Sequence, residues 1–127
     1  MSRIKTMCAA FVVMATGITQ AAANNDIAFS FAECAGRFSA EMEHAWLLND
    51  PVAQVYEQDR ASFVSLTDAS LAPGQGRAIL GHRVEVKLAH AALLQQASFG
   101  TRADRAKTAR HVANTHLATC RTLLLGS

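Results

Sequence analysis

Proline and cysteine are scarce in this sequence, with two and three among 127 residues, and charged residues make up only 17%. Three cysteines are too few for a small fold held together by several disulfides. Half of the residues are hydrophobic, which makes the chain too apolar to be disordered. Its length corresponds to one domain, because a chain of this size does not enclose two independent cores.

Motifs of catalysis and cofactor attachment are also missing. The sequence contains no Gly-x-Ser-x-Gly, no phosphate-binding loop and no Cys-x-x-Cys-His segment. Glu41 and His44 have the Glu-x-x-His spacing of di-iron bundles, but such sites need a second copy and two further carboxylates. We therefore expect no enzymatic activity, no cofactor and no metal bound by this motif.

The first 23 residues have the pattern of a secretory signal peptide. Arg3 and Lys5 precede an apolar stretch over residues 7–18, and Ala21–Ala23 supplies the small residues of a cleavage site. The stretch is shorter than the roughly 20 apolar residues that cross a bilayer. Cleavage near Ala23 would leave one helical domain over residues 24–127, and we expect this protein to be periplasmic or secreted.

Four segments repeat apolar residues at the spacing of an α-helix, and none shows the two-residue period of a strand. The helices are expected over about 30–48, 51–71, 77–99 and 101–125. Because the connections between them are short, the sequence predicts an all-α fold, an antiparallel up-down-up-down four-helix bundle.

Local residues indicate where these helices begin and end. Ser30 and Glu33 form a capping-box pattern ahead of the first helix. Asp50, directly before a proline, is typical of an N-cap. Gly100 suits the left-handed conformation that ends a helix.

The first helix has a regular charge pattern. Glu33, Arg37 and Glu41 lie four residues apart, the usual spacing of ion pairs on a solvent-exposed helix face. We therefore place them on the outside of the bundle.

Cleavage near Ala23 removes Cys8 and leaves Cys34 and Cys120 as a pair. Cys34 lies near the start of the first helix and Cys120 near the end of the fourth, so an antiparallel bundle places them at one level. We predict a disulfide between helices 1 and 4, which an exported protein forms by default, with Cα atoms about 5.5 Å apart.

The charges of residues 24–127 balance overall but divide between its halves. Residues 24–70 carry eight acidic and two basic side chains, and residues 71–127 carry eight basic and two acidic ones. One interpretation is complementary pairing between two helical hairpins. The other is a polarised surface for a partner, formed by Arg102, Arg105 and Arg110.

That partner would be another envelope or secreted protein, with a membrane surface as the weaker alternative. Nucleic acid is not expected as a partner, because no aromatic residues are interleaved with the basic residues. The oligomeric state stays open: Trp46, or the line of small residues Ala32, Gly36 and Ala40, could be buried in a dimer.

Two polar residues interrupt the apolar lines of the middle helices. Asp59 lies on the apolar line of the second helix, where a charge needs a partner. His90 lies on that of the third, about as far from the Pro73–Gly76 loop as Asp59. We predict that they face each other in a core polar layer that includes Arg110. The other loops place Glu41 of the first helix and Arg110 or His111 of the fourth at a similar level.

These features predict a small exported helical protein, a non-enzymatic interaction or accessory protein acting through its charge-polarised surface. The alternative is a bundle that binds a small molecule or a metal in the polar layer around Asp59 and His90. A third interpretation of that layer is purely structural, with the buried pair fixing the register of the helices.

Overall fold

The computed structural model describes residues 18–126, with side chains from residue 26 onwards. It contains four helices: α1 (Ile18–Leu47), α2 (Ala53–Ser70), α3 (Gly76–Phe99) and α4 (Ala103–Leu125). They confirm the predicted all-α class and the positions of the three connections. Residues 1–17, with nearly all of the predicted signal peptide's apolar stretch, lie outside the described residues.

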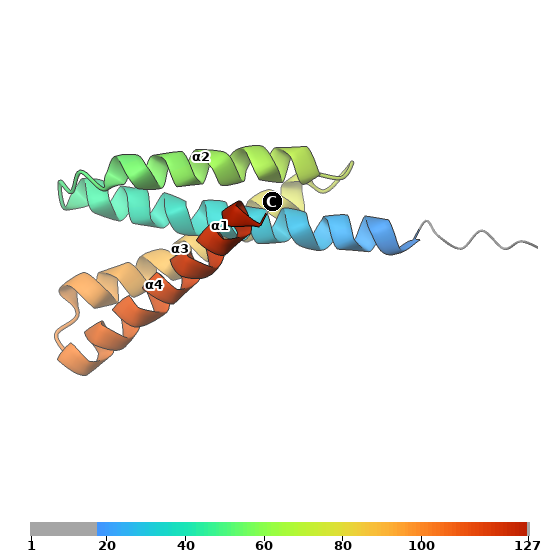
Figure 1. Ribbon diagram of the computed structural model, residues 1–127. Coiled ribbons are helices and arrows are strands. Elements are labelled where there is room, and N and C mark those ends of the chain that lie inside the picture. The colour runs from blue at the N-terminus through green and yellow to red at the C-terminus, as the bar shows by residue number, and fades with distance from the viewer. Residues whose placement is uncertain (1–17, 127) are drawn as a thin grey trace, which may run out of the picture.

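The central helix of the fold is α1. It packs against each of the other three helices, whereas within residues 18–126 the close backbone contacts of α2 are with α1 alone. Figure 1 shows α1 and α2 side by side, with α3 and α4 as a second pair that diverges from the first. α4 packs mainly on α3 and meets α1 over a short stretch.

Small residues let α1 and α3 approach closely. A Cβ atom on Gly36 would lie 2.5 Å from the backbone oxygen of Arg83, so only glycine fits at this crossing. Ala32 packs with Ile79 of α3, and Ala40 is buried in the contact with the same helix. The small-residue line is therefore covered by α3 of the same chain and does not form a dimer face.

The largest buried cluster joins α1 and α2 to the end of α4. The rings of Phe38 and Phe63 stack with centroids 5.7 Å apart. Cys34 and Cys120 form the predicted disulfide inside this cluster, with Cα atoms 5.6 Å apart. The buried members are Phe31, Cys34, Ala35, Phe38, Phe63, Leu117 and Cys120.

The turn between α1 and α2 is a Schellman motif around Asn49. Asn49 has a φ of 55°, and its N–H donates to the carbonyl of Trp46, while that of Asp50 donates to Ala45. The Asp50 carboxylate accepts a hydrogen bond of 2.9 Å from the N–H of Val52, but α2 begins at Ala53 and its N-cap is Val52, two residues after the predicted one.

Two other predicted helix ends are wrong. The first helix already begins at Ile18, so Ser30 lies inside α1, where its hydroxyl donates to the carbonyl of Asp26. Gly100 is extended, with φ of −64°, and not left-handed. A Cβ atom there would lie 2.3 Å from the carbonyl oxygen of Gln96, so the position needs glycine because of close approach.

None of the helices in the described part of the chain is both long and apolar enough to cross a membrane.

Candidate functional site

Glu41 of α1 and His90 of α3 form a buried polar pair. Oε1 of Glu41 lies 2.9 Å from Nε2 of His90, and the two residues are only 4% and 2% exposed. Because a carboxylate can only accept, the pair places the proton of a neutral imidazole on Nε2 and leaves the lone pair on Nδ1. His90 is thus in the core, but its partner comes from α1.

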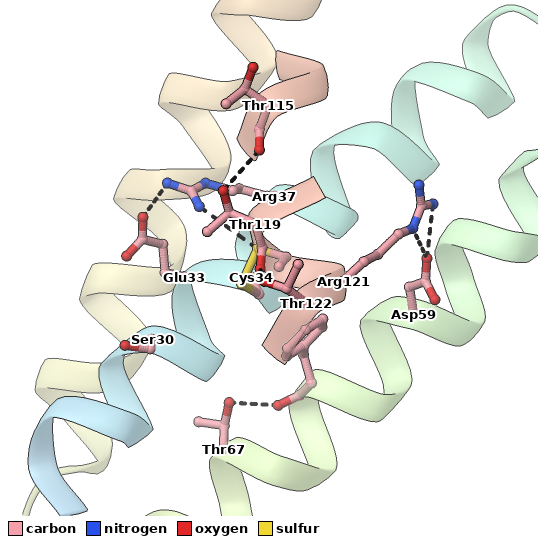
Figure 2. Close-up of a disulfide and its surroundings, with 12 residues drawn as sticks. Ser30, Glu33, Cys34, Arg37, Asp59, Thr67, Thr115, Thr119, Arg121 and Thr122 are labelled. Carbon is pink, nitrogen blue, oxygen red and sulfur yellow. Dashed lines mark hydrogen bonds and ion pairs between the residues drawn. A yellow bond between two sulfur atoms is a disulfide. The ribbon is translucent and has the colours of Figure 1, made fainter. Parts of the chain in front are cut away.

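The three residues of the predicted polar layer do not come together. The carboxylate of Asp59 accepts a hydrogen bond from Arg121 at 3.2 Å (Figure 2), and Arg110 donates to Ser98 at 3.1 Å. Equal distance from a loop places two residues opposite each other only where their helices are neighbours. Here α1 packs on both α2 and α3, and within the described residues no close backbone contact joins those two helices.

A second histidine lies beside His90. The ring of His116, on α4, has its centroid 5.8 Å from that of His90. The Nδ1 atoms of both residues are buried and have no hydrogen-bond partner among the described residues. Burial, assisted by the positive charge of Arg37, lowers the pKa of His116 below its usual range, although Glu33 opposes this.

Both imidazoles line a cavity of about 320 Å³ between α3 and α4. Its volume is at the small end of the range for ligand pockets, and its wall combines apolar side chains with a few polar groups, as such pockets do. The lining residues are Arg37, Val86, Ala89, His90, Leu93 and His116.

The guanidinium of Arg37 is held between an acid and the disulfide. One of its nitrogens is paired with Glu33, one turn earlier on α1, and another lies 3.7 Å from the sulfur of Cys120 (Figure 2). The second oxygen of Glu33 is 3.9 Å from Nε2 of His82 on α3. The disulfide thus anchors α4 next to the residue that α1 contributes to the cavity.

The prediction that Glu33, Arg37 and Glu41 form a solvent-exposed face is wrong. Glu41 is buried and the other two are partly buried, because α1 is covered by α2 on one side and by α3 and α4 on another. A central helix has no wide exposed face. The small residues Gly36 and Ala40, each beside one of these charges, indicate this second buried face in the sequence.

The predicted partner surface is divided. Arg102 and Arg105 are exposed near the start of α4, where Arg102 is paired with Asp104 at 3.0 Å. Arg110 is partly buried and, through its bond to Ser98, faces the end of α3.

Some acidic side chains of the first half pair with basic side chains of the second half within the fold. Lys87 of α3 is 2.6 Å from Glu43 of α1, and the pair of Arg121 with Asp59 joins α4 to α2. Both pairs link the basic half of the chain to the acidic half, as the interpretation of complementary hairpins predicts.

Among the described residues, no three histidine, cysteine, aspartate or glutamate side chains gather in a way that could hold a metal ion. No protein-family model matches the chain, and comparison with curated proteins and with solved structures finds no similar one.

Proposed function

We propose that this is a non-enzymatic binding protein that holds a small molecule in the cavity between α3 and α4. The observation that carries the proposal is that His90 and His116 line one cavity and that the buried Nδ1 atom of each has no hydrogen-bond partner among the described residues. A buried polar atom without a hydrogen bond costs about 1–3 kcal/mol. A ligand that bonds to both atoms offsets this cost.

The ligand in this proposal is a small molecule and not a metal ion. Imidazole nitrogen is a good ligand for zinc or copper, but a tetrahedral protein site needs a third and usually a fourth ligand. In the described residues these histidines are not part of such a group. The proposal thereby keeps His90 from the predicted layer, with Glu41 and His116 in place of Asp59 and Arg110.

The test is to fill the cavity. The protein, labelled with ¹⁵N, is screened by NMR against a library of small fragments, each scored by its shifts of amides around the cavity. The variant Ala89→Phe is designed to place an aromatic ring in the cavity. Ala92→Phe is the matched control, because Ala92, three positions further along the same helix, is exposed like Ala89 but does not line the cavity.

We expect a subset of fragments to shift the cavity amides in the wild type and in Ala92→Phe but not in Ala89→Phe. If no fragment shifts these resonances, or if the two variants bind equally well, the cavity is not a binding site and the proposal is wrong.

A second proposal is that the chain docks another exported protein through its charge-polarised surface. One observation favours it: Leu80, Val84 and Leu88 follow one line of α3 and are 59%, 46% and 63% exposed. No other helix of the described chain covers this line, and Arg102 and Arg105 are exposed on the neighbouring helix α4. A partner with an apolar stripe and acidic flanks would complement both features.

This surface is tested by affinity capture from an envelope extract. We expect one species to be retained in stoichiometric amount, less so at high salt, and lost when Arg102, Arg105 and Arg110 are all changed to Glu. Retention that is unchanged in this triple variant excludes the surface.

We also propose export to an oxidising compartment, periplasmic or extracellular, after cleavage near Ala23. A disulfide is compatible with such a location. We propose as well that successive helices run in opposite directions, up-down-up-down. Their connections of three to five residues, over 48–52, 71–75 and 100–102, support this order. Mass spectrometry of the protein purified from its own host tests the cleavage: a chain that begins at Asn24 supports export, and an intact Met1 contradicts it.

A further inference from the structure

The ionisable side chains that line the cavity are all bases. They are Arg37, His90 and His116, and none of the lining residues is acidic. The two nearest acids already have partners: Glu33 is paired with Arg37, and Glu41 with His90. A ligand that enters between the histidines therefore meets donors and potential cations.

Arg37 is the fixed charge of the cavity. Its guanidinium has five N–H donors, of which Glu33 engages one nitrogen, and the side chain is only 15% exposed. Since Glu33 and the disulfide hold it in place, its remaining donors are positioned before a ligand arrives, which reduces the entropy cost of binding.

The two imidazoles are adjustable donors. A protonated histidine donates from both nitrogens, so a proton on Nδ1 lets each ring bond to an anion. The charged and titratable groups around the rings are Glu33, Arg37 and Glu41 on α1 and His82 on α3, which is paired with Glu33. Burial and the charge of Arg37 lower the pKa of His116, and the negative charge of an anion in the cavity opposes this shift.

The rest of the wall is apolar. Val86, Ala89 and Leu93 form it, and a ligand buried against them gains free energy in proportion to its apolar area. The volume of about 320 Å³ suits a small molecule. The ligand thus needs one anionic end and a compact apolar body.

We propose that the cavity binds a small monocarboxylate with an apolar body, whose carboxylate accepts hydrogen bonds from Arg37 and from the Nδ1 atoms of His90 and His116. This inference rests on the proposed ligand-binding function and specifies its ligand. Binding takes up a proton, because the imidazole that donates from Nδ1 to the carboxylate must be charged if its other nitrogen also carries a proton.

Three compounds of one shape and different charge test the ligand class: benzoate, benzamide and benzylamine. Each is titrated into ¹⁵N-labelled protein at pH 7.5, 6.5 and 5.5. We expect benzoate to bind, with an affinity that rises roughly tenfold from pH 7.5 to 5.5 through the linked proton. Benzamide should bind at least tenfold more weakly than benzoate at pH 5.5, and benzylamine should cause no shifts.

Variants then test the named groups. Arg37→Gln and His116→Gln should each weaken benzoate binding at least tenfold. The matched controls are Arg77→Gln on α3 and His111→Gln on α4, which remove the same groups from exposed positions and should bind like the wild type. If Arg37→Gln does not fold, Arg37→Lys is used instead. It keeps the positive charge without the planar guanidinium and should bind benzoate with intermediate affinity.

Failure of the proposed ligand class can be distinguished from failure of the proposed binding function. If benzamide or benzylamine binds as well as benzoate, or if other fragments bind the cavity and benzoate does not, the ligand class is wrong while the binding function stands. If no compound of any charge binds and Ala89→Phe behaves like Ala92→Phe, the proposed function itself fails and this inference fails with it.

Discussion

Nε2 of His90 lies 2.9 Å from Oε1 of Glu41 in the interior between α1 and α3, and this pair fixes which nitrogen of His90 remains for the cavity. The carboxylate side of the imidazole is satisfied within the fold. The opposite nitrogen, Nδ1, has no hydrogen-bond partner among the described residues. A single hydrogen bond thus both stabilises the α1–α3 contact and leaves Nδ1 for a ligand in the cavity.

Replacing one residue of this pair should lower the free energy of unfolding more than replacing both. In His90→Leu the buried Glu41 carboxylate loses its partner, and we expect the free energy of unfolding to fall by about 3–5 kcal/mol. Glu41→Gln keeps a hydrogen bond and should cost about 1 kcal/mol. Urea denaturation of each variant measures these differences.

The double variant Glu41→Leu with His90→Leu is the control for this interpretation. It should be more stable than His90→Leu alone, because no buried charge is left unpaired. A double variant that is less stable than either single variant would show that packing, and not the charge, dominates at this position.

The Cys34–Cys120 disulfide should contribute strongly to stability. It closes a loop with a sequence separation of 86 residues, and the lost chain entropy of the unfolded state corresponds to about 4.5 kcal/mol. We expect the change Cys34→Ser with Cys120→Ser to lower the free energy of unfolding by about this amount in urea denaturation. Reduction of the wild type with dithiothreitol should have a similar effect.

The same change should loosen the cavity. α4 meets α1 over a short stretch that includes the disulfide, and His116 lies one turn before Cys120. In the absence of urea, and at a temperature at which the double variant is still folded, this variant should bind the cavity ligand more weakly than the wild type. Equal binding by the two proteins would show that α4 is held by its contacts with α3 alone.

Gly36 should not tolerate even the small side chain of alanine. A Cβ atom there would lie 2.5 Å from the backbone oxygen of Arg83, so Gly36→Ala must push α1 and α3 apart. We expect a loss of about 1–3 kcal/mol in stability, typical of overpacked contacts.

Gly81→Ala is the matched control for that substitution. It lies inside α3, and a Cβ atom there would have no neighbour within 4 Å. Alanine has the higher helix propensity, so this variant should be stabilised by up to about 1 kcal/mol. Thermal denaturation of both variants gives the comparison, and a similar loss in both would contradict the assigned close approach.

The sequence predicts local structure and the disulfide well because these depend on residues close in sequence or on a cysteine pair with a single partner each. The three connections follow from turn residues such as Asp50, and Cys34 has only Cys120 to pair with once Cys8 is removed. The extent of α1 is not predicted, because Ser30 satisfies its hydroxyl inside a helix as readily as at its start.

The site is predicted only in part. His90 is correctly placed in the core as an interruption of an apolar line. Its partner depends on which helices are neighbours, and periodicity gives the buried face of each helix but not the order in which the faces meet. The prediction that Glu41 faces solvent is wrong because charge spacing implies a helix with one buried face, whereas α1 has partners on more than one side.

Acid should destabilise the protein through two partly buried histidines, His44 and His116. Burial is the main cause that lowers the pKa values of His116 and His44, followed by the positive charges of Arg37 and Arg110, respectively. Below the ordinary histidine pKa of about 6.5 the unfolded chain takes up protons that the folded one does not. The stability present above pH 6.5 should therefore be lost as the pH falls through the lowered pKa values of the folded state.

Urea midpoints measured between pH 7.5 and 5.5 test this, in a range above the titration of ordinary carboxylates. The wild type should become steadily less stable across it. His116→Gln keeps a polar side chain of similar size without the titrating ring, so its dependence on pH should be shallower. His111→Gln, at an exposed position of the same helix, should run parallel to the wild type. Equal slopes for all three proteins would mean that His116 protonates as easily in the folded chain as in the unfolded one, which its burial beside Arg37 and His90 argues against.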